Sequence, residues 1–495
     1  MSEHDVGGAP QDHPRIPGVV AIPHRLDGRP ARLVTLFGNV NSSGSKQAHY
    51  IFDDGRPAYL EAVLPADGPV RSLTLQTPAA AWHEREMKDQ YGIHIIGHPD
   101  LRPLLFHENW PDGVHPMVDA VGQVPWSNRA YRFLEVQGDG VAEVAVGPVH
   151  AGIIEPGHFR FSVVGDTILH LELRHFYTHK GTERLFQGRR PADGVMLAES
   201  VSGDNCFAHA VCYCQAVEAA LGITVPPRAA AIRLIGLELE RLICHISDVG
   251  GLCTDVGFAV AAASAARIKE TLLAASAQCC GTRFWRGIAA PGGLRMDFES
   301  ARVSEIVRAV AVASMEFAGL TRVILETPSI QNRFEGAGIL KAEAAGDLGV
   351  VGPVARASGI DYDVRRDHRY GAYHPPFEVP TTHYGDVMAR ARIRISEAEI
   401  SARLIQQAAG ALPLGSIREP EGPVRDVHGL SAVESPRGEL LYWLELRGGR
   451  VARCHIQSPS FQNWPAMPFA VAENVIADFP LINKSFNLSY SGCDR

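Results

Sequence analysis

Short apolar runs alternate with turn residues over residues 31–81. The runs are RLVTLFGNV, HYIFDDG, AYLEAVLPADG and VRSLTLQTP, and Gly, Asp and Pro separate them. This pattern predicts antiparallel strands joined by turns. The next stretch, AWHEREMKDQYGI, predicts a short helix over residues 81–90 that ends near Gly92. Together these elements predict a small α+β domain over residues 31–125, preceded by a flexible N-terminal segment, 1–30.

The rest of the chain follows a different pattern. Residues 158–173 (HFRFSVVGDTILHLEL) predict a β-hairpin with its turn at Gly165 and Asp166. From Pro191 to about Leu325 the pattern favours long helices, and the clearest repeat follows Pro227 at positions Ile232, Ile235, Leu239, Leu242, Ile243 and Ile246. More helices are expected over 258–280, 300–319 and 397–411, the last of them after a strand-like MARARIRI, and the tail from Leu440 returns to strands. We therefore expect an α+β chain whose second domain, 144–495, is mainly helical and starts with a hairpin.

Composition narrows the class of protein. A chain of 495 residues is long enough for two or more domains. The net charge of -8 argues against a nucleic-acid-binding protein, which would usually carry a basic excess. The start of the chain lacks the pattern of a secretory signal, and no apolar run is long enough to span a bilayer. Nine scattered Cys, none in a CxxC pair, suit a reducing cytoplasm, and most are expected to be core residues.

The richest candidate site is LAESVSGDNCFAHA, residues 197–210. If this stretch is helical, Ser202 and Asn205 share one face, and His209 lies four residues further on. Thiolates at positions 202 and 205 would make a soft-metal site, but a hydroxyl and an amide stand there instead. Asp204 and Cys206 are the stronger ligands nearby. The alternative interpretation is a polar helix start packed against another domain.

Three further clusters carry polar groups. GPVHAGIIEPGHFRF, residues 147–161, holds His150, Glu155 and His158, which could relay protons or form a solvated loop. The charge run YDVRRDHRYGAY, residues 362–373, predicts an exposed face or a subunit contact. LRHFYTHKGTERLF, residues 173–186, carries His175, His179 and Lys180 and likewise predicts an exposed face or a subunit contact. From the residues alone, these clusters do not name a reaction.

These stretches together resemble a known family. AWHEREMKDQYGIHIIGHPDLRPLL, residues 81–105, resembles the signature of the C-type subunit of complex I. From about Val144 to Arg495 the chain resembles the D-type subunit of complex I and the large subunits of energy-converting nickel–iron hydrogenases. The fused order, C-type and then D-type, is similar to that of formate hydrogenlyase and hydrogenase-4 large subunits. Matching motifs include GPVHAGIIEPGHFRF, HFYTHKGTERLF, YDVRRDHRYGAY, YGDVMARARIR and the closing SFNLSYSGCDR.

The chain departs from the hydrogenase pattern at the metal ligands. The family's RxCGxC and DPCxxC motifs would place four Cys at positions occupied here by Ser202, Asn205, Ser489 and Gly492. Cys206 and Cys493 each stand one residue beyond a ligand position, which on a helix turns the side chain by about a hundred degrees. The resemblance therefore implies no nickel–iron centre, with Cys206 and Cys493 as the weak alternative ligands.

In the D-type subunit of complex I, which also lacks these cysteines, the vacated cavity binds a quinone headgroup. The position of its quinone-binding His falls near Pro156, between Glu155 and His158, and His209 matches a His that follows the first hydrogenase motif. By this resemblance Glu155, His158, His209 and Asp204 would be the proton-exchanging groups. Ser202, Asn205, Ser489 and Gly492 would line the emptied site.

The function implied is that of a peripheral subunit on the cytoplasmic side of the cell membrane. It would pass electrons from an iron–sulfur cluster, held by a partner like the B-type subunit of complex I, toward a quinone-like acceptor, holding no cofactor of its own. A ferredoxin-like subunit and antiporter-like membrane subunits would complete the complex and couple the step to ion movement. Two alternatives stay open: an active hydrogenase large subunit that uses Cys206 and Cys493, and a redox-silent scaffold.

Overall fold

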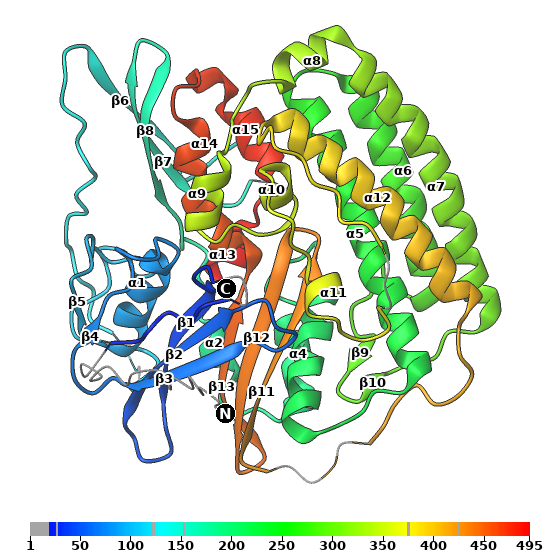
Figure 1. The fold of residues 1–495 in the computed structure, drawn as a ribbon, viewed down its shortest axis with the longest axis horizontal. Coiled ribbons are helices and arrows are strands. Elements are labelled where there is room, and N and C mark those ends of the chain that lie inside the picture. Colours follow the sequence, from blue (N-terminus) through cyan, green and yellow to red (C-terminus); the bar gives the residue numbers. More distant parts are fainter. Residues whose placement is uncertain are drawn as a thin grey trace, which may run out of the picture.

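The computed structural model describes residues 19–495 apart from 26–27, 120–121, 123, 152–153, 374–376, 421 and 423–424, so most of the segment expected to be flexible (1–30) lies outside it. The first unit is an antiparallel sheet in the order β1-β2-β3 with one helix packed on it (Figure 1). Its elements are β1 (Arg32–Val40), β2 (Lys46–Asp53), β3 (Leu60–Pro65), β4 (Val70–Arg71), α1 (Ala80–Tyr91) and β5 (Ile95–Ile96). The expected helix is confirmed, and Gly92 ends it in the left-handed conformation at φ 63°.

The fourth predicted strand is nearly absent. β4 has only two residues, and it pairs with β5 in parallel rather than with β3. After β4 the carboxylate of Glu84 accepts hydrogen bonds from the Leu73 amide and from the hydroxyls of Ser72 and Thr74. Because this buried side chain binds the segment, the chain turns away from the sheet there.

A second antiparallel sheet lies against the first one. It consists of β11 (Val427–Ser435), β12 (Gly438–Arg447) and β13 (Arg450–Gln457), in that order. Apolar side chains fill the seam between the two sheets, with Phe37 and Ile51 on one side and Leu441 and Trp443 on the other. Helix α4 (Cys206–Leu221) packs on β11 and β12. The seam therefore joins the N-terminal unit firmly to the rest of the chain.

Four long helices form a bundle beside this second sheet (Figure 1). They are α5 (Pro227–Asp255), α6 (Ala259–Cys280), α7 (Ser300–Glu326) and α12 (Val387–Gly410). The predicted core face of α5 is confirmed, and Pro227 occupies its first turn. The strand-like MARARIRI was a wrong expectation, since it lies inside α12. Most of these residues are buried, including the polar Arg390 and Arg394. The alternation of polar and apolar residues therefore does not match exposed and buried positions, and the helical spacing cannot be recognised from the sequence.

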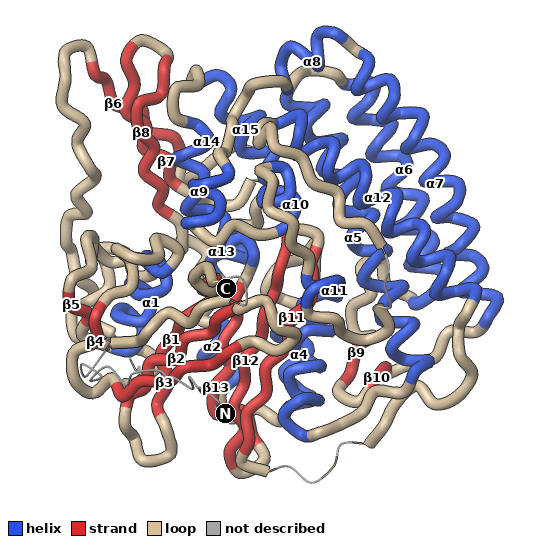
Figure 2. Tube along the Cα trace, viewed as in Figure 1, coloured by secondary structure: helices blue, strands red, loops and turns tan. Residues whose placement is uncertain are grey.

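The remaining elements surround the C-terminal end of the chain. The predicted hairpin is part of a three-stranded sheet of β6 (Val141–Val146), β7 (His158–Val164) and β8 (Thr167–Arg174). The rest of the chain forms mainly short helices and loops, some of which lie between this sheet and the bundle (Figure 2). They include α2 (Thr182–Phe186), α3 (Val195–Ala198), α8 (Pro328–Phe334), α9 (Ala342–Asp347), α10 (Gly352–Ala357), α11 (Val364–Asp367), α13 (Pro459–Asn463), α14 (Met467–Val471), α15 (Phe479–Phe486) and α16 (Tyr490–Asp494); β9 (Ala289–Ala290) and β10 (Gly293–Leu294) pair beside α4 and α5.

Candidate functional site

Two distant segments of the chain meet at the positions singled out from the sequence. The hydroxyl oxygens of Ser202 and Ser489 lie 2.9 Å apart. Ser202 is in the turn that precedes α4, and Ser489 is the N-cap residue of α16. The expectation that Ser202 and Asn205 share a helix face was wrong, because α4 begins only at Cys206. Ser202 therefore lies in a turn and not in a helix, but the two predicted segments, around Ser202 and around Ser489, still meet.

The short helix α16 is fixed by hydrogen bonds to serines. The Ser489 hydroxyl accepts from the Gly492 amide at 2.9 Å, and the Ser489 amide donates to the Ser460 hydroxyl at 2.9 Å. A Cβ atom added at Gly492 would lie 3.0 Å from both Cβ and Oγ of Ser489. Glycine is therefore the residue that this closely packed turn accommodates best.

An ion pair extends the site toward the helix bundle. The Arg437 guanidinium binds Asp204 through two hydrogen bonds, at 3.1 and 2.5 Å, and also donates to the Asn487 carbonyl. The Asn487 amide in turn donates to Asp248, whose second oxygen accepts from Arg394 at 2.9 Å. Burial alone would raise the pKa of Asp204, but Arg437 outweighs this effect and lowers it. Asp204 therefore carries a negative charge at the edge of the site, where half of its side chain is exposed.

Three histidines near the site have a ring nitrogen with no hydrogen-bond partner among the described residues: His158, His175 and His209. His209 shares its other nitrogen with the Tyr442 hydroxyl at 2.8 Å. Burial lowers the pKa of His175 and of His209 to about 3. Both imidazoles are therefore neutral at physiological pH, and each can donate one hydrogen bond and accept another.

The predicted Glu155–His158 relay does not form a direct contact in the described part of the chain. Glu155 accepts from the Ser491 amide at 2.9 Å, while His158 bonds to the Gly147 carbonyl at 3.1 Å. His150 likewise bonds to the Gly157 carbonyl at 2.8 Å. Each of these side chains secures the loop before β7, and Glu155 joins that loop to α16.

Two ionisable groups lie close to Glu155. The ammonium of Lys180 binds the Ser200 and Val201 carbonyls at 3.3 and 3.2 Å, and burial lowers its pKa. Asp494 accepts from the Phe176 and Thr178 amides. Burial and, to a smaller extent, Glu155 raise the pKa of Asp494 to about 6, against the effect of these bonds. Of these groups, the buried Asp494 is therefore the one whose raised pKa allows proton exchange near neutral pH.

The donor set does not fit a nickel–iron centre. The four positions supply two hydroxyls, one amide and no side-chain donor at Gly492, whereas soft metals require thiolates. The two serine hydroxyls hydrogen-bond to each other. Cys206 donates instead to the Phe284 carbonyl, and the thiol of Cys493 is buried beside Asp494 and Arg495. Among the described residues, His, Cys, Asp and Glu side chains form no group of three placed to bind a metal ion.

The charge run at 362–373 was expected to form an exposed face or a subunit contact, and the exposed face was wrong for two of its members, Arg365 and His368. Arg365 is fully buried, bound to Asp363 and Glu238, and His368 is buried against Asp53 and the Pro57 carbonyl. Arg365 and His368 are buried because the acidic side chains of Glu238 and Asp53, from distant elements, pair with them, which spacing along the sequence cannot reveal.

Sequence reasoning also missed Arg437 and Asp494. Arg437 lies in the turn between β11 and β12, a place where arginine is usually solvated, yet it is 6% exposed. Only the fold brings this turn to Asp204. Asp494 lies two residues beyond the predicted Gly492, and its role as an acceptor for the Phe176 and Thr178 amides has no signal in the local sequence.

Comparisons with known proteins identify the family of this chain. The family described as "Respiratory-chain NADH dehydrogenase, 49 Kd subunit" matches residues 255–429 and 422–495, and the 30 Kd subunit family matches residues 37–121. Formate hydrogenlyase subunit 5 of Escherichia coli K12 is 33% identical over 94% of this chain and 84% of its own length. NADH-quinone oxidoreductase subunit 4 of Thermus thermophilus is 30% identical over 72% of this chain and 94% of its own length.

A solved structure shares the fold. It belongs to the membrane-bound sulfane sulfur reductase, an archaeal respiratory membrane complex, and superposes with a TM-score of 0.68 at 25% identity over 72% of this chain and 99% of that one. No helix in the described part of this chain combines the length and apolar content needed to cross a membrane. The chain thus belongs to the family of the respiratory-chain NADH dehydrogenase 49 Kd subunit and its hydrogenase-complex relatives, with a 30 Kd-type unit fused ahead of it, and is a subunit of a complex I-related oxidoreductase.

Proposed function

We propose that this chain is the metal-free redox subunit of such a complex, passing electrons from an iron–sulfur partner to a quinone-like acceptor at the Ser202–Ser489 site. The observation that carries the proposal is the hydrogen bond between these two serines. At these two positions the hydrogenase motifs would carry thiolates that bind metal. Here two hydroxyls bind each other instead, which supports a site without metal. The relative named as a quinone oxidoreductase makes a quinone the acceptor that we favour.

The residues around the site suit a ring that carries carbonyl oxygens. A bound quinone would supply a two-electron acceptor that also takes up two protons. The neutral imidazoles of His175 and His209 each have a nitrogen free of partners among the described residues, and either could donate to a carbonyl. Glu155 stands at the exposed edge, and the buried Asp494, whose pKa is raised to about 6, lies close to it; together they could return protons to the site.

The exposed edge of the site favours coverage by a partner. Asp204, Glu155 and Lys180 are exposed in the isolated chain, while Ser202 beside them is buried. An iron–sulfur protein like the B-type subunit of complex I, bound on this surface, would bring its cluster close to the acceptor. A ferredoxin-like subunit and antiporter-like membrane subunits would complete the assembly on the cytoplasmic side of the membrane. Their ion movement would be coupled to the redox step.

Quinone reduction by the purified complex tests the proposal. With a low-potential artificial donor, Glu155→Gln and His209→Gln should each lower the rate of quinone reduction by about 100-fold, the usual size of a general acid–base contribution, while assembly is unchanged. His428→Gln, whose side chain is 60% exposed on β11, is the matched control and should leave the rate unchanged. Wild-type rates in both test variants, with intact assembly, would favour a redox-silent scaffold.

A further inference from the structure

A second group of ionisable side chains lies inside the molecule, away from the serine site. It contains four carboxylates, those of Glu238, Asp363, Glu397 and Glu434. Three guanidiniums, from Arg241, Arg356 and Arg365, and the imidazole of His245 complete it. These side chains come from α5, α10, α11 and its N-cap, α12 and β11, and each is at most 1% exposed. We call this group the buried cluster.

The contacts within the buried cluster are continuous. Arg365 links Glu238 and Asp363, with its closest contact, to Asp363, at 2.7 Å. Arg356 reaches Asp363 at 3.4 Å, Glu434 at 2.9 Å and Glu397 at 2.7 Å. His245 bonds to the second oxygen of Glu397 at 2.9 Å. The four carboxylates therefore share the same cations, so a proton bound to any one of them changes the charge balance of the whole cluster.

The charges in the buried cluster do not balance. The other nitrogen of His245 has no hydrogen-bond partner among the described residues, which fits a neutral ring that donates to Glu397. Burial lowers the pKa of His245 as well. Four ionised carboxylates against three guanidiniums would then leave one negative charge. A net charge that is fully buried costs several kcal/mol, so binding one proton is favourable.

We infer that the buried cluster stores one exchangeable proton, held chiefly on Glu434, and that this proton enters and leaves through a surface pocket lined by Tyr370 and Tyr373. This inference does not depend on the acceptor proposed above. Glu434 is the favoured carboxyl because burial, together with the nearby Asp363, raises its pKa to about 7. The groups that face it are Asp363, Arg365, Arg356, Arg241, Tyr370 and, through Arg356, Glu397.

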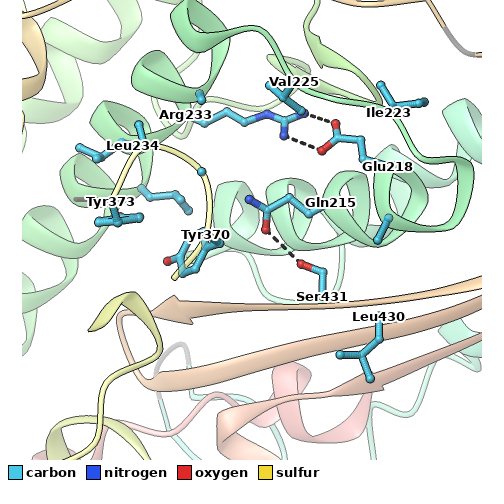
Figure 3. Close-up of a pocket in the computed structure, with 15 residues that line it drawn as sticks. Gln215, Glu218, Ile223, Val225, Arg233, Leu234, Tyr370, Tyr373, Leu430 and Ser431 are labelled. Carbon is cyan, nitrogen blue, oxygen red and sulfur yellow. Dashed lines mark hydrogen bonds and ion pairs between the residues drawn. The ribbon is translucent and has the colours of Figure 1, made fainter. Parts of the chain in front are cut away.

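The pocket provides the route to solvent. It has a volume of about 380 Å³ and lies between α4, α5, β11 and residues 370–373. Tyr370 and Tyr373 stand on one wall, across from the Glu218–Arg233 pair (Figure 3). The Tyr373 hydroxyl donates to Glu238 at 2.5 Å, and the Tyr370 hydroxyl accepts from the Glu434 amide at 3.1 Å. Glu218 and Arg233 pair one to one, so the pocket itself adds no net charge.

Infrared titration of the full chain between about pH 5 and pH 9 tests the proton store, because a protonated carboxyl has its own C=O band. As the pH rises through about 7, the wild type should lose the C=O band of one carboxylic acid, and Glu434→Gln should lack this band throughout. Glu397→Gln should lack it too, because removing any one carboxylate neutralises the cluster. Glu439→Gln is the matched control: Glu439 pairs with Glu434 across the β11–β12 hairpin, and its pKa is lowered overall, so this variant should keep the band.

The outcomes separate the two parts of the inference. If Glu434→Gln and Glu397→Gln both titrate like the wild type, the cluster holds no exchangeable proton. If Glu434→Gln does not fold, the comparison of Glu397→Gln with the wild type still decides. After a pH jump, the C=O band of Tyr373→Phe should change to the same final intensity as in the wild type, but at least several-fold more slowly. A wild-type rate would show that the pocket is not the entrance.

Discussion

The Ser202 and Ser489 hydroxyls share a hydrogen bond of 2.9 Å although 287 residues separate them in the chain. The Ser202 hydroxyl also donates to Asp204 at 3.1 Å, so Ser489 is the donor in the bond between the two serines, and the Ser489 oxygen accepts from the Gly492 amide. This contact therefore ties the turn before α4 to the C-terminal helix α16. By the motif resemblance, it lies at positions where the hydrogenase motifs carry cysteines, and it pairs the two hydroxyls that stand there instead.

Ser202→Ala should lower the free energy of unfolding by about 1–2 kcal/mol, because a buried hydroxyl with two partners is lost. Urea denaturation of the full chain measures the change. Ser200→Ala is the matched control, since within the described part of the chain the exposed Ser200 hydroxyl bonds to the Met196 carbonyl alone. A Ser202→Ala chain as stable as the control would mean that the contact between the two segments adds nothing to stability.

Gly492→Ala should destabilise the chain by about 1 kcal/mol or more, because the new Cβ lies 3.0 Å from Ser489, whose position is fixed by its hydrogen bonds. Gly410→Ala, at the end of α12, provides the comparison: a Cβ there meets no atom within 4 Å, so it should be neutral or slightly stabilising. Equal thermal midpoints for the two variants would contradict the tight packing of the α16 turn.

Arg495→Ala should lower the free energy of unfolding by about 3–5 kcal/mol. Arg495 is buried, and its guanidinium binds Glu86 of α1 at 2.6 Å and Glu183 at 3.2 Å. Its loss leaves the Glu86 carboxylate without a cation. The double variant Arg495→Ala/Glu86→Gln should therefore lose less than the sum of the two single changes. Additive effects in this cycle would show that the two side chains do not interact.

Stability of the seam between the N-terminal unit and the rest should depend on His368. Its Nδ1 faces the Pro57 carbonyl at 3.0 Å and its Nε2 faces Asp53 at 3.4 Å. Both partners accept, so the ring is held doubly protonated, and Asp53 raises the pKa of His368 despite burial. This contribution is complete below the unfolded pKa of about 6.5 and is lost as pH rises through the higher folded value.

Hydrogen exchange at residues 53–57, compared at about pH 6 and pH 8.5, measures this effect. The wild type should protect these amides less at the higher pH, and His368→Gln should show low protection at both values. His428→Gln should behave as the wild type does. Protection that is independent of pH in the wild type would exclude a charged His368.

The sequence pattern predicted the elements whose cause is local. The helix ending at Gly92, the turn at Gly165 and the core face of α5 follow from glycine conformation and apolar spacing alone. The failures share a different cause. α12 was partly misassigned because Arg390 and Arg394 are buried among carbonyls and Asp248, and Arg365 was expected on the surface because its partner Glu238 lies 127 residues away.

The candidate site was predicted in part for the same reason. Motif positions identified Ser202, Asn205, Ser489 and Gly492, and the fold brings Ser202 to Ser489. The hydrogen-bonded neighbours that position them, Arg437 and Ser460, come from other elements and carry no local signal. Glu155 was named as a proton-exchanging group, and the fold places it against the Ser491 amide, which no spacing rule anticipates.

The nickel content of the purified intact complex, determined by elemental mass spectrometry and expressed per copy of this chain, tests the central claim most directly. With Ser202, Asn205, Ser489 and Gly492 at the ligand positions, we predict far less than one nickel per chain and no hydrogen uptake. One nickel per chain together with hydrogen uptake would contradict the account.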